Sequence, residues 1–216
     1  MSVRRLKKSY QNVTGRFYST LLNRLVQFDS LLERDFILLL DLHPNVRWFA
    51  EQPMRISVGV EDGPEQFYVP DFLVTFHGGG FLGWRTRRPW IVETKCSSDL
   101  RANWPKLRPK FRAGVREARK RDCLFRIVTE SRLFATELAN AQFLRRYTNA
   151  DIPPAAIETI VRKVQLSGRT TIGNLSSETM APIERVDPAV WVAIARRLIA
   201  AEFCKPFGPQ TIVWMR

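Results

Sequence analysis

Residues 69–95 place the strongest limits on what this 216-residue chain can fold into. Aromatic and β-branched side chains dominate residues 69–74 and 90–95, which predicts two strands. A glycine run and a proline between them predict turns and a connecting loop. Because side chains alternate between the two faces of a strand, Glu93 and Lys95 are expected to point the same way. An acid and a lysine therefore share one face of an otherwise apolar strand.

An aspartate at the start of the first strand joins this acid and lysine. Asp71 follows a proline, and Glu93, Thr94 and Lys95 follow two apolar residues. Carboxylate oxygens are the hard ligands that Mg²⁺ prefers, and a lysine beside them can bind a phosphate or position a water molecule. Pro-Asp, a gap and then Glu-x-Lys is the pattern of the PD-(D/E)xK nucleases. The alternative is an Asp71 that only caps a strand and a Glu93–Lys95 pair on an exposed edge. The apolar residues before Glu93 favour the metal site.

A helix is predicted to begin at Ser30 and to end at His43 and Pro44. Ser30 and Glu33 have the Ser-x-x-Glu spacing of a capping box, and apolar residues follow at helical spacing. Glu33 lies on the same helical face as the apolar residues four and seven positions later. Two roles remain open for Glu33, and they can coexist: it caps the helix, or it is an acid that the helix delivers to the metal cluster.

The charge balance of the chain is strongly basic. There are 34 Lys and Arg against 21 Asp and Glu, which gives a net charge of +13. This balance favours a nucleic-acid partner; an anionic membrane surface competes, but no long apolar segment supports an embedded protein. The N-terminus lacks the apolar core of a signal peptide, and three cysteines without CxxC spacing fit a reduced compartment. We expect a cytoplasmic protein that associates with the nucleoid when it is assembled on DNA.

Two basic segments are candidates for contact with a phosphate backbone. Residues 1–26 are predicted to form a basic N-terminal arm. The basic residues near its start are Arg4, Arg5, Lys7 and Lys8. Residues 101–121 are predicted to form a helix with one apolar face and a cationic remainder. Its candidate DNA-binding residues are Arg108, Lys110, Arg112, Arg116, Arg119 and Lys120. A solvated tail and a solvated helix face are the alternatives, but the scarcity of acids favours phosphate contact.

The remaining core elements complete an α/β domain over residues 27–150. Further strands are predicted over residues 56–60 and 124–128, and a helix over residues 136–147. The strand that carries Asp71 is predicted to extend over residues 67–76. Asp-Gly within the turn at residues 61–64 predicts a hairpin whose second strand carries Asp71. A helix, this hairpin and a strand with Glu-x-Lys make up the core of the nuclease fold.

A small, mostly helical C-terminal domain is expected over residues 151–216, after an Asp-Ile-Pro-Pro boundary. Its predicted elements are helices over 155–164, 171–177 and 188–201 and a hairpin over 202–214. Three short helices followed by a hairpin is the order of a winged helix. The third helix is mostly apolar, and only Arg196 and Arg197 offer DNA contacts. This favours protein docking slightly over DNA binding.

Four motifs together resemble the TnsA endonuclease subunits of heteromeric cut-and-paste transposases. They are Ser30-x-x-Glu33-Arg34-Asp35-Phe36, Glu51-Gln52-Pro53, Pro70-Asp71-Phe72 and Glu93-Thr94-Lys95. The resemblance spans residues 25–130 and is far more specific than the nuclease pattern alone. It implies a restriction-endonuclease-like PD-(D/E)xK core with its helix acid at Glu33, its hairpin aspartate at Asp71 and its Glu-x-Lys element at Glu93 and Lys95.

The resemblance also implies a mechanism and partners. Asp71 and Glu93, with Glu33 and the Thr94 carbonyl, would hold one or two Mg²⁺ ions, for which Mn²⁺ can substitute. Lys95 would contact the scissile phosphate or orient the attacking water. The implied partners are double-stranded DNA at transposon ends, a DDE-type transposase that joins the 3′ ends, and an AAA+ ATPase that regulates both. The protein would then cut the 5′, non-transferred strands.

Two other functions stay open. The first is a stand-alone restriction or repair endonuclease of the same fold, which cuts DNA without partners. The second is a non-catalytic winged-helix DNA-binding protein on a degenerate nuclease scaffold. The intact set of Asp71, Glu93 and Lys95 argues against the second alternative.

Overall fold

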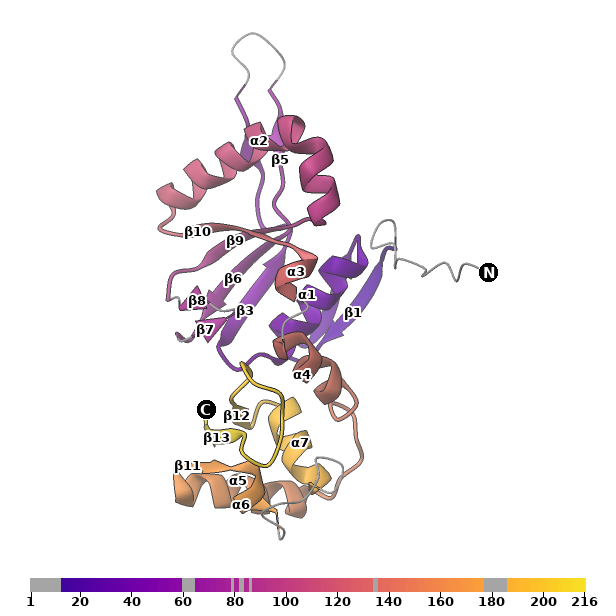
Figure 1. The fold of residues 1–216 in the computed structure, drawn as a ribbon, viewed down its shortest axis with the longest axis vertical. Coiled ribbons are helices and arrows are strands. Elements are labelled where there is room, and N and C mark those ends of the chain that lie inside the picture. The colour runs from indigo at the N-terminus through magenta and orange to yellow at the C-terminus, as the bar shows by residue number, and fades with distance from the viewer. Residues whose placement is uncertain are drawn as a thin grey trace, which may run out of the picture.

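The computed structural model describes residues 13–59, 65–78, 80–81, 84–85, 87–133, 136–176 and 186–216 (Figure 1). The elements up to the basic helix are β1 (Gly15–Ser19), β2 (Arg24–Phe28), α1 (Leu31–Leu42), β3 (Val46–Glu51), β4 (Ile56–Ser57), β5 (Phe67–Tyr68), β6 (Phe72–Phe76), β7 (Gly80–Phe81), β8 (Trp84–Arg85), β9 (Trp90–Thr94) and α2 (Ser97–Lys120). Those that follow are β10 (Leu124–Val128), α3 (Glu130–Leu133), α4 (Thr136–Arg145), α5 (Pro154–Ser167), β11 (Arg169–Thr171), α6 (Ile172–Leu175), α7 (Pro188–Ala195), β12 (Ile199–Ala201) and β13 (Ile212–Met215).

A four-stranded mixed sheet with the order β10-β9-β6-β3 forms the centre of the first part of the chain. β6 pairs antiparallel with both β3 and β9, and β9 pairs parallel with β10. Alternation along β6 directs Phe72 towards Phe36 of α1, with ring centroids 5.3 Å apart. On β9, Ile91 packs instead with Ala118 of α2. The sheet is therefore covered by α1 on one face and α2 on the other, an α/β arrangement compatible with a nuclease core.

A hairpin that the sequence did not indicate covers part of α1. β1 and β2 pair antiparallel, with Gly15 opposite Phe28, and Phe17 and Val26 are buried in the main core. The basic arm was expected to run to residue 26, but in the structure residues 15–26 belong to this packed hairpin. Arg4, Arg5, Lys7 and Lys8 lie outside the described residues. The arm that the structure leaves open is therefore at most residues 1–12.

Three further elements differ from the sequence-based expectation. Val46–Glu51 is a sheet strand, although its burial does not alternate and its pairing shifts register after Val46. The strand expected over residues 67–76 is divided into β5 and β6, with Asp71 between them. The helix expected over residues 188–201 ends at Ala195. In each case a local bulge, break or turn replaces regular structure, and side-chain periodicity alone does not reveal it.

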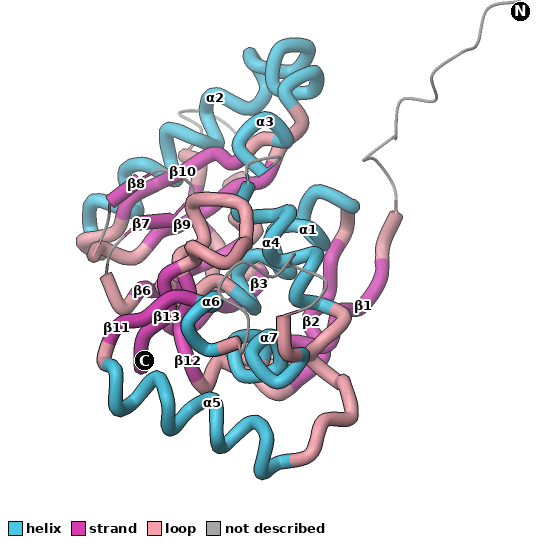
Figure 2. Tube along the Cα trace, turned by 60° about the horizontal axis from the view of Figure 1, so that its bottom comes forward, coloured by secondary structure: helices cyan, strands magenta, loops and turns pink. Residues whose placement is uncertain are grey.

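The C-terminal part has the element order α5-β11-α6-α7-β12-β13. Its three strands form an antiparallel sheet with the order β11-β13-β12, and α5 runs alongside it (Figure 2). Helix α7 is apolar on every side, and Ala189–Ala195 are all buried. Because it exposes almost no side chain, α7 has no surface with which to enter a DNA groove.

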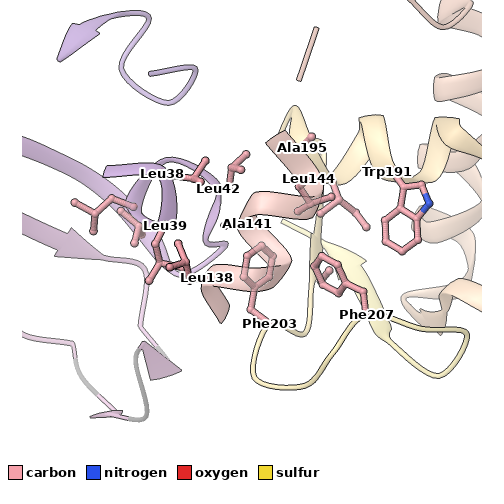
Figure 3. Packing of buried hydrophobic residues seen from close by; sticks show 14 of the residues in the cluster. Leu38, Leu39, Leu42, Leu138, Ala141, Leu144, Trp191, Ala195, Phe203 and Phe207 are labelled. Carbon is pink, nitrogen blue, oxygen red and sulfur yellow. The ribbon is translucent and has the colours of Figure 1, made fainter. Parts of the chain in front are cut away.

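Helix α4 joins the two parts into one hydrophobic core (Figure 3). Its Leu138 and Leu144 lie among residues of both α1 and the C-terminal segment. The buried residues around it are Leu38, Leu39 and Leu42 of α1 and Trp191, Phe203 and Phe207 of the C-terminal part. The boundary expected at residue 151 is thus bridged by continuous apolar packing.

Arg197 fastens the C-terminal part to the end of α1. Its guanidinium donates to the carbonyl oxygens of Asp41 at 2.6 Å, His43 at 3.2 Å and Val46 at 2.5 Å. Arg196 donates to the Ala150 carbonyl at 3.0 Å. The prediction that Arg197 would be available for DNA is therefore wrong, because its guanidinium is engaged with three backbone carbonyls. Arg196 is exposed, and its availability for DNA stays a prediction. Within the described residues, no helix is long and apolar enough to cross a membrane.

Candidate active site

The end of β9 and the start of β6 bring Asp71 against Thr94. Both the backbone N–H and the hydroxyl of Thr94 donate to Asp71 Oδ2, at 2.7 and 2.8 Å. The backbone of Asp71 is held as well, because its carbonyl accepts the N–H of Gln52 at 2.8 Å. Gln52 has a positive φ of 43°, a strained conformation for a residue other than glycine. Together these contacts fix the Pro70–Asp71 corner in one position.

Glu93 lies on the same strand but is held by different groups. The hydroxyl of Tyr68 donates to Glu93 Oε2 at 2.7 Å, and Lys95 Nζ lies 3.6 Å from Glu93 Oε1. Only 5% of Glu93 is exposed, so its carboxylate depends on these partners for stabilisation. Lys95 Nζ is also 4.0 Å from the carboxylate of Asp99, in the first turn of α2. Glu93 and Lys95 therefore share one face, as their spacing predicts.

Glu33 reaches the site from the first turn of α1. The capping prediction is confirmed: Ser30 Oγ accepts the Glu33 N–H at 3.1 Å. The Glu33 carboxylate in turn accepts the Ser30 hydroxyl at 3.0 Å and the Asp29 N–H at 2.8 Å. Burial raises the pKa of Glu33 above its ordinary value, and the nearby charge of Asp71 raises it further. Glu33 is thus a cap whose carboxyl group also lies within the electrostatic influence of Asp71.

The three carboxyl groups make the site electrostatically unusual. Burial, followed by the charge of Glu93, raises the pKa of Asp71 well above its ordinary value. Burial also raises the pKa of Glu93, while the Tyr68 hydrogen bond and the charge of Lys95 act against that shift. Because burial and the neighbouring Glu93 both disfavour the charged form of Asp71, a bound cation would stabilise that charged form.

The donor set fits a hard divalent cation, although the side chains do not form a complete cage. Across the described residues, no three His, Cys, Asp or Glu side chains gather closely enough to hold a metal ion by themselves. Asp71 and Glu93 supply oxygen donors beside the Thr94 backbone, whereas imidazole and thiolate ligands are not in this set. Mg²⁺ is commonly bound by one or two carboxylates together with water and phosphate oxygens, so this chemistry matches.

The basic residues of α2 that were predicted to contact DNA are all exposed. They are Arg108, Lys110, Arg112, Arg116, Arg119 and Lys120. Lys110 is close enough to Glu93 for its charge to lower the pKa of that carboxyl. Sequence reasoning did not identify Tyr68 as part of the site, because its hydrogen bond to Glu93 joins residues far apart in the chain. Gln52 was noted only within the Glu51-Gln52-Pro53 motif, and its contact with the Asp71 backbone depends on a positive φ that the motif does not reveal.

A mixed sheet with helices on both faces that sets an aspartate against a Glu-x-Lys strand is compatible with a nuclease core. Residues 43–130 match the family model described as "TnsA-like endonuclease N terminal". The resemblance to TnsA-type endonucleases is therefore confirmed over that segment. The segment includes Asp71, Glu93, Thr94 and Lys95, whereas Glu33 precedes it. No curated protein matches the chain.

Proposed function

We propose that the protein is a metal-dependent DNA endonuclease that cuts the 5′, non-transferred strands at transposon ends in Tn7-like transposition. One observation carries the proposal: Asp71 accepts hydrogen bonds from the backbone N–H and the hydroxyl of Thr94, the residue between Glu93 and Lys95 in the Glu-x-Lys motif. This arrangement lies inside the segment that matches the TnsA-like endonuclease family. The match supports nuclease activity in that setting, and the choice of strand is the part that the proposal adds.

The side chains have distinct tasks in this mechanism. Asp71, Glu93 and the Thr94 carbonyl would hold Mg²⁺ or Mn²⁺, with Glu33 as an auxiliary acid at the edge of the cluster. When bound, the ion supplies Lewis-acid stabilisation of the negative charge that develops on the phosphate. The Lys95 ammonium neutralises the scissile phosphate or orients the attacking water. Thr94 keeps Asp71 in place, and Tyr68 does the same for Glu93.

The strong positive charge of the protein favours the approach of DNA. Helix α2 begins directly after the Glu-x-Lys strand, so its start lies close to the proposed site of the cut. Lys110 is the α2 cation that acts on Glu93, and it is a candidate contact for the phosphate next to the cut. The arm residues are further candidates for contact with the flanking duplex: Arg4, Arg5, Lys7 and Lys8. Such contacts are non-specific and weaken as salt increases.

The C-terminal part is proposed to be a winged-helix-like module used for protein docking. Its element order and three-stranded sheet support that fold. The burial of α7 and the engagement of Arg197 with α1 support docking over DNA reading. The partners proposed from the family are a DDE-type transposase subunit, which joins the 3′ strands, and an AAA+ ATPase regulator.

Substitution of Asp71 by Ala tests the proposal. In a reconstituted transposition assay, Asp71→Ala is expected to change the products from simple insertions to branched cointegrates that remain attached to donor DNA. Asp151→Ala, at an exposed aspartate, is the matched control and is expected to give simple insertions. Chelation of the metal by EDTA is expected to have the same effect on 5′ cutting as Asp71→Ala. Simple insertions at normal frequency with Asp71→Ala would overturn the proposed role of the site.

A further inference from the structure

A groove between α2 and β10 lies outside the carboxylate site. It has a volume of about 590 Å³. Its apolar lining consists of Trp104, Phe111, Val115, Phe125 and Ile127. Ring contacts join the floor: the centroids of Trp104 and Phe111 are 6.0 Å apart, and those of Phe111 and Phe125 are 5.9 Å apart. Trp104 is 47% exposed and Val115 is 37% exposed, so apolar surface on this face remains in contact with water.

Gly114 allows α2 and β10, the two sides of the groove, to lie close together. A Cβ at this position would lie 2.5 Å from the ring of Phe125, which a real side chain does not tolerate. β10 can therefore lie directly against the middle of α2, with the groove opening beside it. The shape of the groove depends on rigid elements rather than on a loop.

Four arginines form the rim of the groove. Arg108, Arg112, Arg116 and Arg119 all line it. Three of them also line an adjoining hollow of about 410 Å³ beside Val58 and Gly59. Within the described part of the chain, none of the four forms an ion pair with a carboxylate, whereas Glu117 pairs with Arg121 at 2.6 Å. The rim is thus a row of cations without acidic partners, spaced at intervals of four, four and three residues along one helical face.

From an apolar floor beneath an unpaired arginine rim, we infer that this groove binds an amphipathic, acidic helical segment of a partner protein. Apolar side chains spaced at i, i+3, i+4 and i+7 would cover the floor, and flanking Asp or Glu would meet the arginines. The rim from Arg108 to Arg119 spans roughly 16 Å, which corresponds to about three turns of an opposing helix. This surface goes beyond the proposed nuclease activity and does not depend on it.

Two other occupants fit the surface less well. A second copy of the chain carries a charge of +13 and would bring like charge to the rim. Single-stranded DNA would need several exposed rings for stacking. Here Trp104 is the exposed ring, Phe125 is half-buried and Phe111 is buried. Val115 and Ile127 are aliphatic. A duplex would contact the arginines but would leave the apolar floor uncovered.

Binding of a designed peptide to the full-length protein tests the inference. The probe is a fluorescein-labelled 18-residue helical peptide with a Leu and Phe stripe flanked by Glu. One control peptide carries Lys in place of Glu, and another carries Gln in place of Leu and Phe. Fluorescence anisotropy is expected to show saturable binding of the acidic peptide, at least tenfold tighter than that of either control. Equal binding of all three peptides, or no binding of the acidic one, would overturn the inference.

Two pairs of variants locate the binding. Val115→Asp places a negative charge on the apolar floor and is expected to weaken binding of the acidic peptide at least tenfold. Its matched control is Leu166→Asp, at an apolar residue of α5 that is 80% exposed, and a change of less than twofold is expected. Arg112→Glu and the control Arg162→Glu make the same comparison for the rim without altering the apolar floor. If Val115→Asp and Arg112→Glu bind the peptide like wild type, or if an oligo-dT strand binds in its place and is lost with Val115→Asp, the inference is wrong.

Discussion

The two ends of helix α1 each carry buried charge, and they treat it in opposite ways. At the C-terminal end, Asp41 accepts the hydroxyl of Ser19, the N–H and hydroxyl of Thr20 at 3.2 and 2.7 Å, and the Leu21 N–H at 2.9 Å. Arg197 satisfies the backbone carbonyls beside it. At the N-terminal end, Glu33 lies near Asp71. Burial raises the pKa of both carboxyl groups, the charge of Asp71 raises that of Glu33 further, and the charge of Glu93 raises that of Asp71 further.

The charge of Asp41 is satisfied within the protein and stabilises the fold. The charges of Glu33 and Asp71 are less fully satisfied, and a bound cation would stabilise them. A buried ion with a full set of hydrogen-bond partners contributes to a unique structure, and its removal leaves those partners unsatisfied. Buried carboxylates that repel one another are destabilising until a cation or proton arrives. The charge at the C-terminal end of α1 thus stabilises the fold, whereas the charge at its N-terminal end borders the proposed metal site.

The contrast is tested most strongly at Arg197. Arg197→Gly removes the donor to three carbonyl oxygens, although it relieves the positive φ of 61° at this position. Lost hydrogen bonds to a charged group outweigh the backbone relief, so we expect a destabilisation of about 3 kcal/mol. Urea unfolding measures the change. Asn23→Gly, at an exposed turn with φ 52°, is the backbone control and is expected to be neutral or slightly stabilising. An Arg197→Gly protein as stable as wild type would remove the contrast.

The two ends of α1 are expected to affect the pH dependence of stability with opposite signs. Burial and the charge of Arg197 lower the pKa of His43 to about 3, and the side chain is only 3% exposed. A base with a lowered pKa stabilises the fold above its unfolded pKa of about 6.5 and loses that contribution as the pH falls. We expect a loss of about 2 kcal/mol from this group between pH 7 and pH 5.

His43→Gln is expected to flatten that part of the pH profile of chemical unfolding. Asp71 shifts in the opposite sense: an acid with a raised pKa destabilises the fold at neutral pH and stops doing so as the pH falls through its folded pKa. Asp71→Asn should therefore make the loss of stability on acidification steeper. The same slope in both variants would contradict the comparison.

A smaller effect is expected at Tyr68, which holds Glu93 without being a candidate ligand. Tyr68→Phe removes the hydroxyl that donates to Glu93 at 2.7 Å but keeps the buried ring. One hydrogen bond to a carboxylate corresponds to about 1 kcal/mol, so the Mg²⁺ concentration for half-maximal cleavage should increase about fivefold. Tyr18→Phe removes an exposed hydroxyl of β1 that donates to Asn23 in the β1–β2 turn, and it serves as the control. If the melting temperature changes but the Mg²⁺ dependence does not, Tyr68 has only a structural role.

Local pattern predicted much of this molecule. The strands beside Asp71 and around Glu93 follow from their aromatic and β-branched residues, and the cap at Ser30 follows from its spacing to Glu33. Those features depend on residues close together in the chain. The sequence also predicted the helices α5, α6 and α7, because the breaks between them contain proline or glycine, but it did not predict β11 or β12.

The remaining features depend on long-range contacts or on backbone geometry that leaves no residue pattern. Helix α7 ends early because Arg197 adopts φ 61°, a conformation usually marked by glycine. The Tyr68–Glu93 hydrogen bond joins residues 25 positions apart, and only the folded sheet brings them together. Apolar packing through α4 also continues across the boundary that Pro153 and Pro154 had indicated, and this packing joins residues far apart in the chain.

The smallest expected effect concerns Glu33, which is both hydrogen-bonded as a helix cap and close to the charge of Asp71. Both carboxylate oxygens are occupied by cap hydrogen bonds, at 3.0 and 2.8 Å, so its contribution to the site is through charge. Glu33→Gln keeps a residue suited to the third position of a capping box, and stability should change by no more than about 0.5 kcal/mol. We expect cleavage at saturating Mg²⁺ to fall about threefold, because the charge beside Asp71 is lost while its ligands remain. Glu158→Gln, at an exposed position on α5, is the control. A hundredfold loss with unchanged stability would show that Glu33 leaves its cap to bind the metal directly, and the N-terminal end of α1 would then belong to the catalytic centre.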